Sequence, residues 1–135
     1  LAALLTAREK ALGHHANKDG LAAHAPVRVY CSVHAHSSID KAVRIAGIGD
    51  ANLVRIPVEG PRFSMQPKAL GAAIARDRAA GLHPAAIVAC LGGTSVGACD
   101  DIAAVAAVAR RHGLYLHVDA AWAGQNGIVV TNTPD

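Results

Sequence analysis

Residues 85–91 read Ala-Ala-Ile-Val-Ala-Cys-Leu, and Gly92-Gly93-Thr94-Ser95 follows directly. The first seven residues carry almost no polar group. An apolar run of this length, between Pro84 and a glycine pair, is typical of a strand that is covered on both faces, as in a parallel sheet. The stretch therefore predicts a buried strand that ends in a glycine-rich loop.

Further strands and helices alternate along the chain around this stretch. The spacing of apolar residues predicts strands at 27–32, 52–58 and 114–118, and helices at 1–16, 37–46, 67–80 and 100–112. Pro67 fits the first position of a helix, and Gly113 fits a helix end. Ser37, followed three residues later by Asp40, predicts a capping box. The alternation favours an α/β domain with a mostly parallel sheet and right-handed crossovers.

Composition excludes several classes of protein. The 135 residues are 52% hydrophobic and 17% charged, which suits one domain with a core and excludes a disordered chain. No apolar run approaches the ~18 residues of a membrane span, and no signal-peptide pattern is found. The net charge is +3, but the basic residues are dispersed, and Arg110-Arg111 is their one adjacent pair. We therefore expect neither a membrane nor a nucleic acid as partner.

Cysteine and histidine usage bears on compartment and metal binding. Cys31, Cys90 and Cys99 are odd in number and form no CxxC motif, which indicates a reducing, cytoplasmic location. Cys31 and Cys90 fit small buried residues of strands. The eight histidines include no HExxH motif or other zinc-ligand spacing, so no metal site is expected.

Polar residues follow three of the predicted strands at their carboxyl ends, where ligands bind in open α/β sheets. His34 and His36 follow the strand at 27–32, the loop 92–95 follows the strand at 85–91, and Asp119 ends the strand at 114–118. Each has an ordinary structural interpretation: a hydrogen-bonded histidine, a tight turn, and a capping or ion-paired carboxylate. Their convergence on one edge of the sheet predicts a ligand site in which Asp119 pairs with a cationic group.

Four segments, in this order, resemble the group II pyridoxal-phosphate-dependent amino-acid decarboxylases, above all the aromatic-amino-acid branch. They are residues 34–42 (HAHSSIDKA), 77–84 (DRAAGLHP), 91–95 (LGGTS, followed by Asp100) and 117–124 (HVDAAWAG). The resemblance implies an incomplete large domain of the fold-type I pyridoxal-phosphate-dependent transferase kind, with an α/β fold. Residues 1–124 would form this partial cofactor-binding domain, and residues 125–135 a divergent or truncated tail.

The resemblance also implies roles for four residues around pyridoxal 5'-phosphate. His36 would stack on one face of the pyridine ring, Ala121 would pack on the other, and Thr94 would lie close to the cofactor. Asp119 would bind the ring nitrogen, and a carboxylate there favours the protonated ring, which accepts the electrons left when carbon dioxide departs. His36 and Asp119 are thus the implied catalytic residues.

The implied activity is decarboxylation of an L-amino acid, with an aromatic one expected, to the amine and carbon dioxide by a homodimeric full-length protein. None of Lys18, Lys41 and Lys68 matches the family's Schiff-base lysine, so this chain alone is expected to be an inactive internal fragment. Gly93 also stands where the family usually has threonine. Two alternatives stay open: another fold-type I enzyme, of the aldehyde lyase or desulfurase type, or a non-catalytic fragment.

Overall fold

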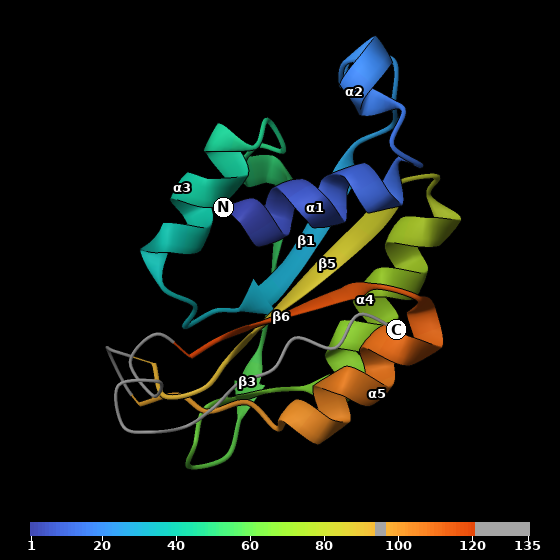
Figure 1. Cartoon of the computed structure of the whole chain (residues 1–135). Helices are drawn as coiled ribbons and strands as arrows, with labels where there is room; N and C mark the ends of the chain where they lie inside the picture. Colours follow the sequence, from blue (N-terminus) through green and yellow to red (C-terminus); the bar gives the residue numbers. More distant parts are fainter. Residues whose placement is uncertain (94–96, 121–135) are drawn as a thin grey trace.

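The computed structural model describes residues 1–93 and 97–120, which form a four-stranded parallel sheet with helices on both faces (Figure 1). The sheet order is β2-β1-β5-β6, with β1 Val27–Ser32, β2 Leu53–Ile56, β5 His83–Cys90 and β6 Tyr115–Asp119. The helices are α1 Ala2–Ala11, α2 Ala16–Asp19, α3 Ser37–Ile45, α4 Pro67–Ala79 and α5 Ile102–His112, with a 3-10 turn η1 at Asp50–Asn52. The predicted α/β class and the central strand are confirmed.

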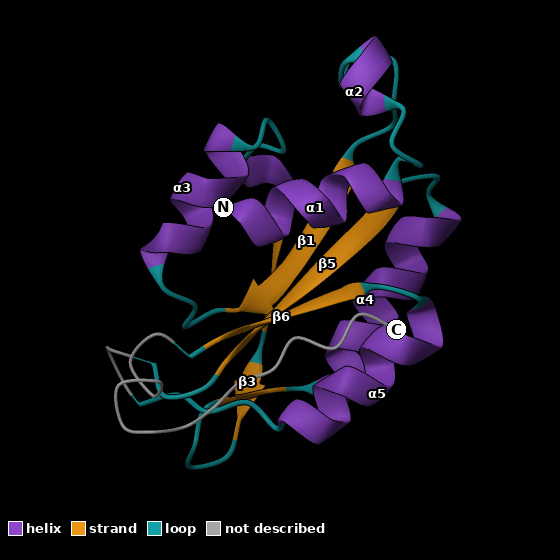
Figure 2. Cartoon of the chain, viewed as in Figure 1, coloured by secondary structure: helices purple, strands orange, loops and turns teal. Residues whose placement is uncertain are grey.

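Side chains of β5 alternate between two apolar cores, one on each face of the sheet. Ala86 and Val88 belong to the core that includes α1 and α3, whereas Ile87 and Ala89 belong to the core that includes α4 and α5. Figure 2 shows these two pairs of helices on opposite sides of the sheet. All four side chains are buried. This is why residues 85–91 contain almost no polar side chain: neither face of the strand meets water.

The connections between strands reverse direction at the boundary between β1 and β5. From β1 the chain passes through α3 to the outer strand β2, and from β5 it passes through α5 to β6 on the other side. These two crossover helices lie on opposite faces of the sheet. The loops that leave β1 and β5 therefore diverge, which opens a ligand-binding crevice in sheets of this topology.

The first predicted helix and the strand predicted at 52–58 extend furthest beyond the observed elements. The first helix ends at Ala11 because Gly13 and His14 both adopt positive φ, at 61° and 63°. The strand predicted at 52–58 is divided at Pro57, which has no N–H for a ladder bond. Beyond it, β3 Val58–Glu59 pairs antiparallel with β4 Ser64–Met65 in a small hairpin that the sequence pattern does not predict.

A buried polar cluster connects α4 to β1 on the side of the sheet away from α3. The Asp77 carboxylate of α4 accepts hydrogen bonds from the Tyr30 hydroxyl at 2.7 Å and from Arg28 Nε at 3.1 Å. Asp77 is 5% exposed, and these two hydrogen bonds offset the cost of burying its polar side chain. Asp77 opens one of the segments that carry the family resemblance, and its role in the structure is to hold the fold together.

Within the described residues, no helix is both long and apolar enough to cross a membrane.

Candidate active site

Asp119 is the last residue of β6 and lies directly beside Cys90 of β5 in the sheet register. Along β6, Leu116 and Val118 contact the core under α4 and α5, whereas Tyr115 contacts the core under α1 and α3. Because side chains alternate along a strand, Asp119 belongs with Tyr115 on the α1–α3 face. The carboxylate thus stands at the carboxyl end of the sheet, half-buried, on a defined face.

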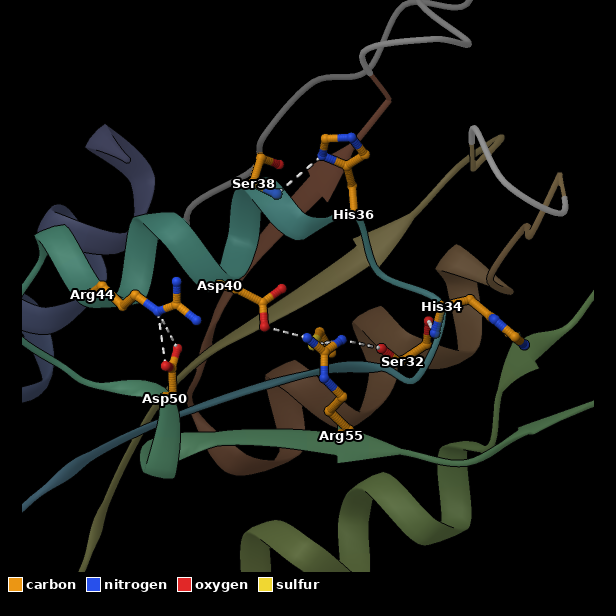
Figure 3. A network of polar contacts seen from close by, with 9 residues as sticks. Ser32, His34, His36, Ser38, Asp40, Arg44, Asp50 and Arg55 are labelled. Atoms are coloured by element: carbon orange, nitrogen blue, oxygen red, sulfur yellow. Dashed lines mark hydrogen bonds and ion pairs between the residues drawn. The ribbon is translucent and has the colours of Figure 1, made fainter.

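His36 lies on the same face, because it is the residue that begins α3. Its Nδ1 accepts a hydrogen bond from the backbone N–H of Ser38 at 3.1 Å (Figure 3). The predicted capping box is therefore wrong: His36, and not Ser37, caps this helix, since an imidazole nitrogen can accept the same N–H. With Nδ1 occupied as an acceptor, the neutral ring carries its proton on Nε2.

The turn between β1 and α3 separates the two histidines that the sequence places close together. Ser32 is buried, and its hydroxyl oxygen accepts a bond from the His34 N–H at 3.2 Å. The His34 ring packs edge-on against Phe63, with 5.3 Å between the ring centroids. In Figure 3 the His34 and His36 side chains extend away from each other. The His34 side chain thus has a packing role, and His36 lies at the carboxyl end of the sheet.

An ion pair that the sequence analysis missed anchors α3 to the sheet. Arg55 of β2 donates through Nη2 to the Asp40 carboxylate of α3 at 2.5 Å, and through Nη1 to the Ser32 carbonyl at 3.5 Å (Figure 3). The hydrogen bond from Arg55 lowers the pKa of the Asp40 carboxyl. The pair therefore holds the first turn of α3, and with it His36, against the ends of β1 and β2.

The loop after β5 is closed at its base by Asp100. One carboxylate oxygen accepts the Cys90 N–H and the other accepts the Met65 N–H, each at 2.7 Å. Burial raises the pKa of this carboxyl, and the two backbone bonds oppose that effect. The next helix, α5, is capped by the neighbouring acid Asp101, whose carboxylate accepts the Ala104 N–H at 3.0 Å. The signal in the sequence is the pair of adjacent acids, since one of them suffices as a cap; the backbone contacts of Asp100 were not predicted from it.

Two further site residues expected from the sequence, Thr94 and Ala121, lie outside the described residues.

Negative charge accumulates at this edge of the sheet. Burial, together with the nearby Asp100 and Asp119 carboxylates, raises the pKa of the Cys90 thiol to about 11. Burial lowers the pKa of His117, while Asp119 partly opposes that change. An electronegative strand end on the same face as an exposed imidazole suits a flat, positively charged ring such as a protonated pyridine. Within residues 1–93 and 97–120, no cluster of three or more His, Cys, Asp or Glu residues could hold a metal ion.

Comparison with known proteins agrees with this geometry. The family model "Pyridoxal-dependent decarboxylase conserved domain" matches residues 1–129. The chain belongs to this family. Its membership favours the decarboxylases over the aldehyde lyase and desulfurase types as the fold-type I class. The cofactor by which the family is named is the one that the residues at the sheet edge fit.

Curated relatives of this pyridoxal-dependent decarboxylase chain are named for their action on aromatic amino acids. It is 41% identical over 128 residues to aromatic-L-amino-acid decarboxylase of Bos taurus, covering 92% of this chain and 26% of that protein. It is 39% identical over 125 residues to tryptophan decarboxylase 1 of Oryza sativa subsp. japonica, covering 92% of this chain and 24% of the relative. The chain thus spans about a quarter of the length of these relatives.

Solved structures show the same fold. The crystal structure of mouse CSAD matches with a TM-score of 0.84 at 34% identity, over 90% of this chain and 26% of that one. The crystal structure of Oryza sativa TDC with PLP and tryptamine matches with a TM-score of 0.77 at 38% identity, over 87% of this chain and 24% of that one. The sheet and helices of this decarboxylase-family chain therefore have the fold-type I arrangement.

Proposed function

We propose that the protein containing this chain decarboxylates an aromatic L-amino acid to the corresponding amine with pyridoxal 5'-phosphate as its cofactor. The observation that carries the proposal is the placement of Asp119 and His36. Both lie on the α1–α3 face at the carboxyl end of a parallel sheet, in a chain of the pyridoxal-dependent decarboxylase family. The aromatic substrate class rests on the names of the relatives.

When bound, the cofactor supplies a conjugated ring that accepts electrons from the bond to the departing carboxylate. Asp119 holds a proton at the ring nitrogen, because an adjacent carboxylate favours the charged form of a base. His36 would stack on one face of the ring, and the neutral imidazole would carry its proton on Nε2 because Nδ1 accepts the Ser38 N–H. The Arg55–Asp40 pair keeps His36 in place by fixing α3. Thr94 and Ala121 complete the contacts to the cofactor in this proposal.

The remaining parts of the active site belong to the proposal as well. The lysine that joins the cofactor covalently comes from a segment outside these 135 residues, so the isolated chain is inactive. In this proposal residues 1–124 belong to the cofactor-binding domain, and residues 125–135 are a divergent or truncated tail. The full-length protein works as a cytoplasmic homodimer. The coverage of about a quarter of the relatives' length supports a contribution from further segments.

A second product class has its own support among the relatives. The chain is 40% identical over 97 residues to phenylacetaldehyde synthase of Petunia hybrida, covering 71% of this chain. Incubating the full-length protein with Phe, Tyr, Trp, Dopa, His and Glu, and analysing for amines and aldehydes, distinguishes the two. We expect the amine; an aldehyde as the main product would overturn the assignment of simple decarboxylation.

Replacing the residue assigned to the ring nitrogen tests the mechanism. In the full-length protein, Asp119→Asn is expected to lower kcat for amine formation by about a hundredfold or more, because a neutral amide no longer stabilises the ring cation. The absorbance spectrum of the bound cofactor should change with it. Asp50→Asn is a matched control, since Asp50 forms an exposed pair with Arg44 on the surface. An unchanged kcat in Asp119→Asn would contradict the role of this residue.

A further inference from the structure

The most completely buried acid at the carboxyl end of the described sheet has no assigned role. Asp100 is 3% exposed, and its two carboxylate oxygens accept backbone N–H groups from Cys90 and Met65, both at 2.7 Å. Among the interactions of the described residues, it has no ion pair with a cationic side chain. Burying a carboxylate without a cationic partner costs free energy, which only its hydrogen bonds offset. The two charge-assisted bonds of Asp100 are therefore strong, and they fix the backbone groups that donate to it.

Asp100 takes the place of a neighbouring strand for the last residue of β5. Pairing between β1 and β5 ends at Val88, two residues before Cys90. At Cys90 the partner is Asp100: its carboxylate accepts the Cys90 N–H, and its own N–H donates to the Cys90 carbonyl at 2.8 Å. Both backbone groups of Cys90 are thus satisfied by one residue, and the ladder extends beyond the end of β1.

On the side of β5 that faces away from Asp100, the same stretch of backbone pairs with Asp119. Cys90 is in register with Asp119, and the Leu91 N–H donates to the Asp119 carbonyl at 3.0 Å. Successive N–H groups of a strand point to opposite edges, so Asp100 and Asp119 bind the two sides of one short backbone segment. A shift of Cys90 toward or away from Asp100 would therefore move Asp119 by the same backbone connection.

We propose that Asp100 is a positioning residue of the cofactor site, which sets the location of Asp119 through the backbone of Cys90 and Leu91. The neighbouring acid is not equivalent, because Asp101 is exposed and caps α5. A carboxylate is required at position 100 because both of its oxygens accept N–H groups. The amide of asparagine would direct an NH₂ group at one of these donors.

The test rests on the proposed function and uses the full-length protein. Asp100→Asn is expected to raise the dissociation constant for pyridoxal 5'-phosphate about tenfold, which corresponds to about 1.4 kcal/mol. The spectrum of the bound cofactor should shift in the same direction as in Asp119→Asn. Two matched controls should stay within about twofold of the wild type, less than about 0.4 kcal/mol. Asp101→Asn keeps the helix cap, and Ser64→Ala removes a 2.6 Å bond from the β3–β4 hairpin to the Cys99 carbonyl without touching Cys90.

Hydrogen exchange measured without cofactor tests the positioning separately. In Asp100→Asn the Leu91 amide should exchange faster, although Asp100 does not bond to it, while Ser64→Ala should leave it protected. A protein that binds no pyridoxal 5'-phosphate but shows this exchange pattern would refute the proposed function, and would support the control of the Cys90–Leu91 backbone by Asp100.

Three results would overturn the proposal for Asp100. One is wild-type cofactor affinity and spectrum in a folded Asp100→Asn protein, and another is an equal loss of affinity in Ser64→Ala. If Asp100→Asn does not fold, Asp100→Glu retains a carboxylate and takes its place in both measurements. The third result is failure of both Asp100→Asn and Asp100→Glu to fold, which would show that Asp100 serves folding alone.

Discussion

At the scale of single residues, side chains at the carboxyl end of the sheet are held by main-chain partners. His36 is fixed by the N–H of Ser38, Asp100 by that of Cys90, and the Ser32 hydroxyl accepts the His34 N–H. Such contacts orient a side chain without requiring a second side chain of a particular type. They are consequently invisible in a search for paired chemical groups, and the sequence alone therefore does not reveal the backbone partners of Asp100.

The three thiols should differ sharply in reactivity. Burial raises the pKa of Cys31 to about 12 and that of Cys90 to about 11, whereas Cys99 is partly exposed. Since the thiolate is the nucleophile and forms only as pH rises toward the pKa, Cys31 and Cys90 should resist iodoacetamide at pH 8. Peptide mapping of the native protein should find Cys99 alkylated, and the other two only after denaturation. Rapid alkylation of Cys90 in the native protein, whether wild type or Cys99→Ser, would contradict the buried environment of Cys90.

At the scale of helices and strands, the ends of elements follow local rules except where two elements meet. Pro67 begins α4, and Gly113 ends α5 with a left-handed conformation at φ 67° and ψ 34°, as the sequence predicts. The start of α3 departs from the rule because His36 supplies the cap. The β3–β4 hairpin departs as well, because contacts with distant segments hold its four paired residues in place. The Met65 N–H donates to Asp100, which also binds the end of β5, and the Ser64 hydroxyl donates to the Cys99 carbonyl.

Gly113, which follows the end of α5, and Gly71, which lies within α4, should respond to alanine with opposite signs. Gly113→Ala should destabilise the protein by about 1 kcal/mol, because a side chain disfavours positive φ even where its Cβ meets open space. Gly71→Ala should stabilise it by about 0.5–1 kcal/mol, because Gly71 lies within α4 and a Cβ there makes only an ordinary contact at 3.9 Å. Urea unfolding measures both. Equal signs for the two variants would contradict the backbone assignment.

At the scale of the whole molecule, burial of titratable groups couples stability to pH. Burial lowers the pKa of His117 below its usual 6.5, with Asp119 in partial opposition, and lowers that of His112 likewise. The unfolded chain therefore binds more protons than the folded one in this range, so stability rises with pH there. The contribution of these groups is present above about pH 6.5 and is lost as the pH falls toward their folded pKa values.

Removing one of these histidines should flatten the dependence. In His117→Gln the fall in unfolding free energy between pH 7 and pH 5 should be smaller than in the wild type, because one group no longer takes up a proton on unfolding. His15→Gln is the control, since His15 is exposed on the surface and its replacement should leave the slope unchanged. Equal slopes in His117→Gln and the wild type, from urea titrations across this range, would show that burial does not govern this group.

The sequence by itself determined the α/β class, the buried strand at 85–91, the placement of His36 and Asp119 at strand ends, and the family. These follow from local patterns: apolar runs, helix-ending glycines and short motifs that each depend on a few neighbouring residues. Thr94 and Ala121 stay predictions.

Tertiary structure alone decided which residues support the site. Asp100 binds Met65 and Cys90, and Arg55 joins Asp40 across 15 residues of chain. Strand order, the face on which Asp119 lies and the reversal between β1 and β5 also depend on pairing between distant segments. The physical reason is that a buried charge is stabilised by whichever donors folding brings to it, and these donors, often backbone N–H groups, carry no signature in the sequence.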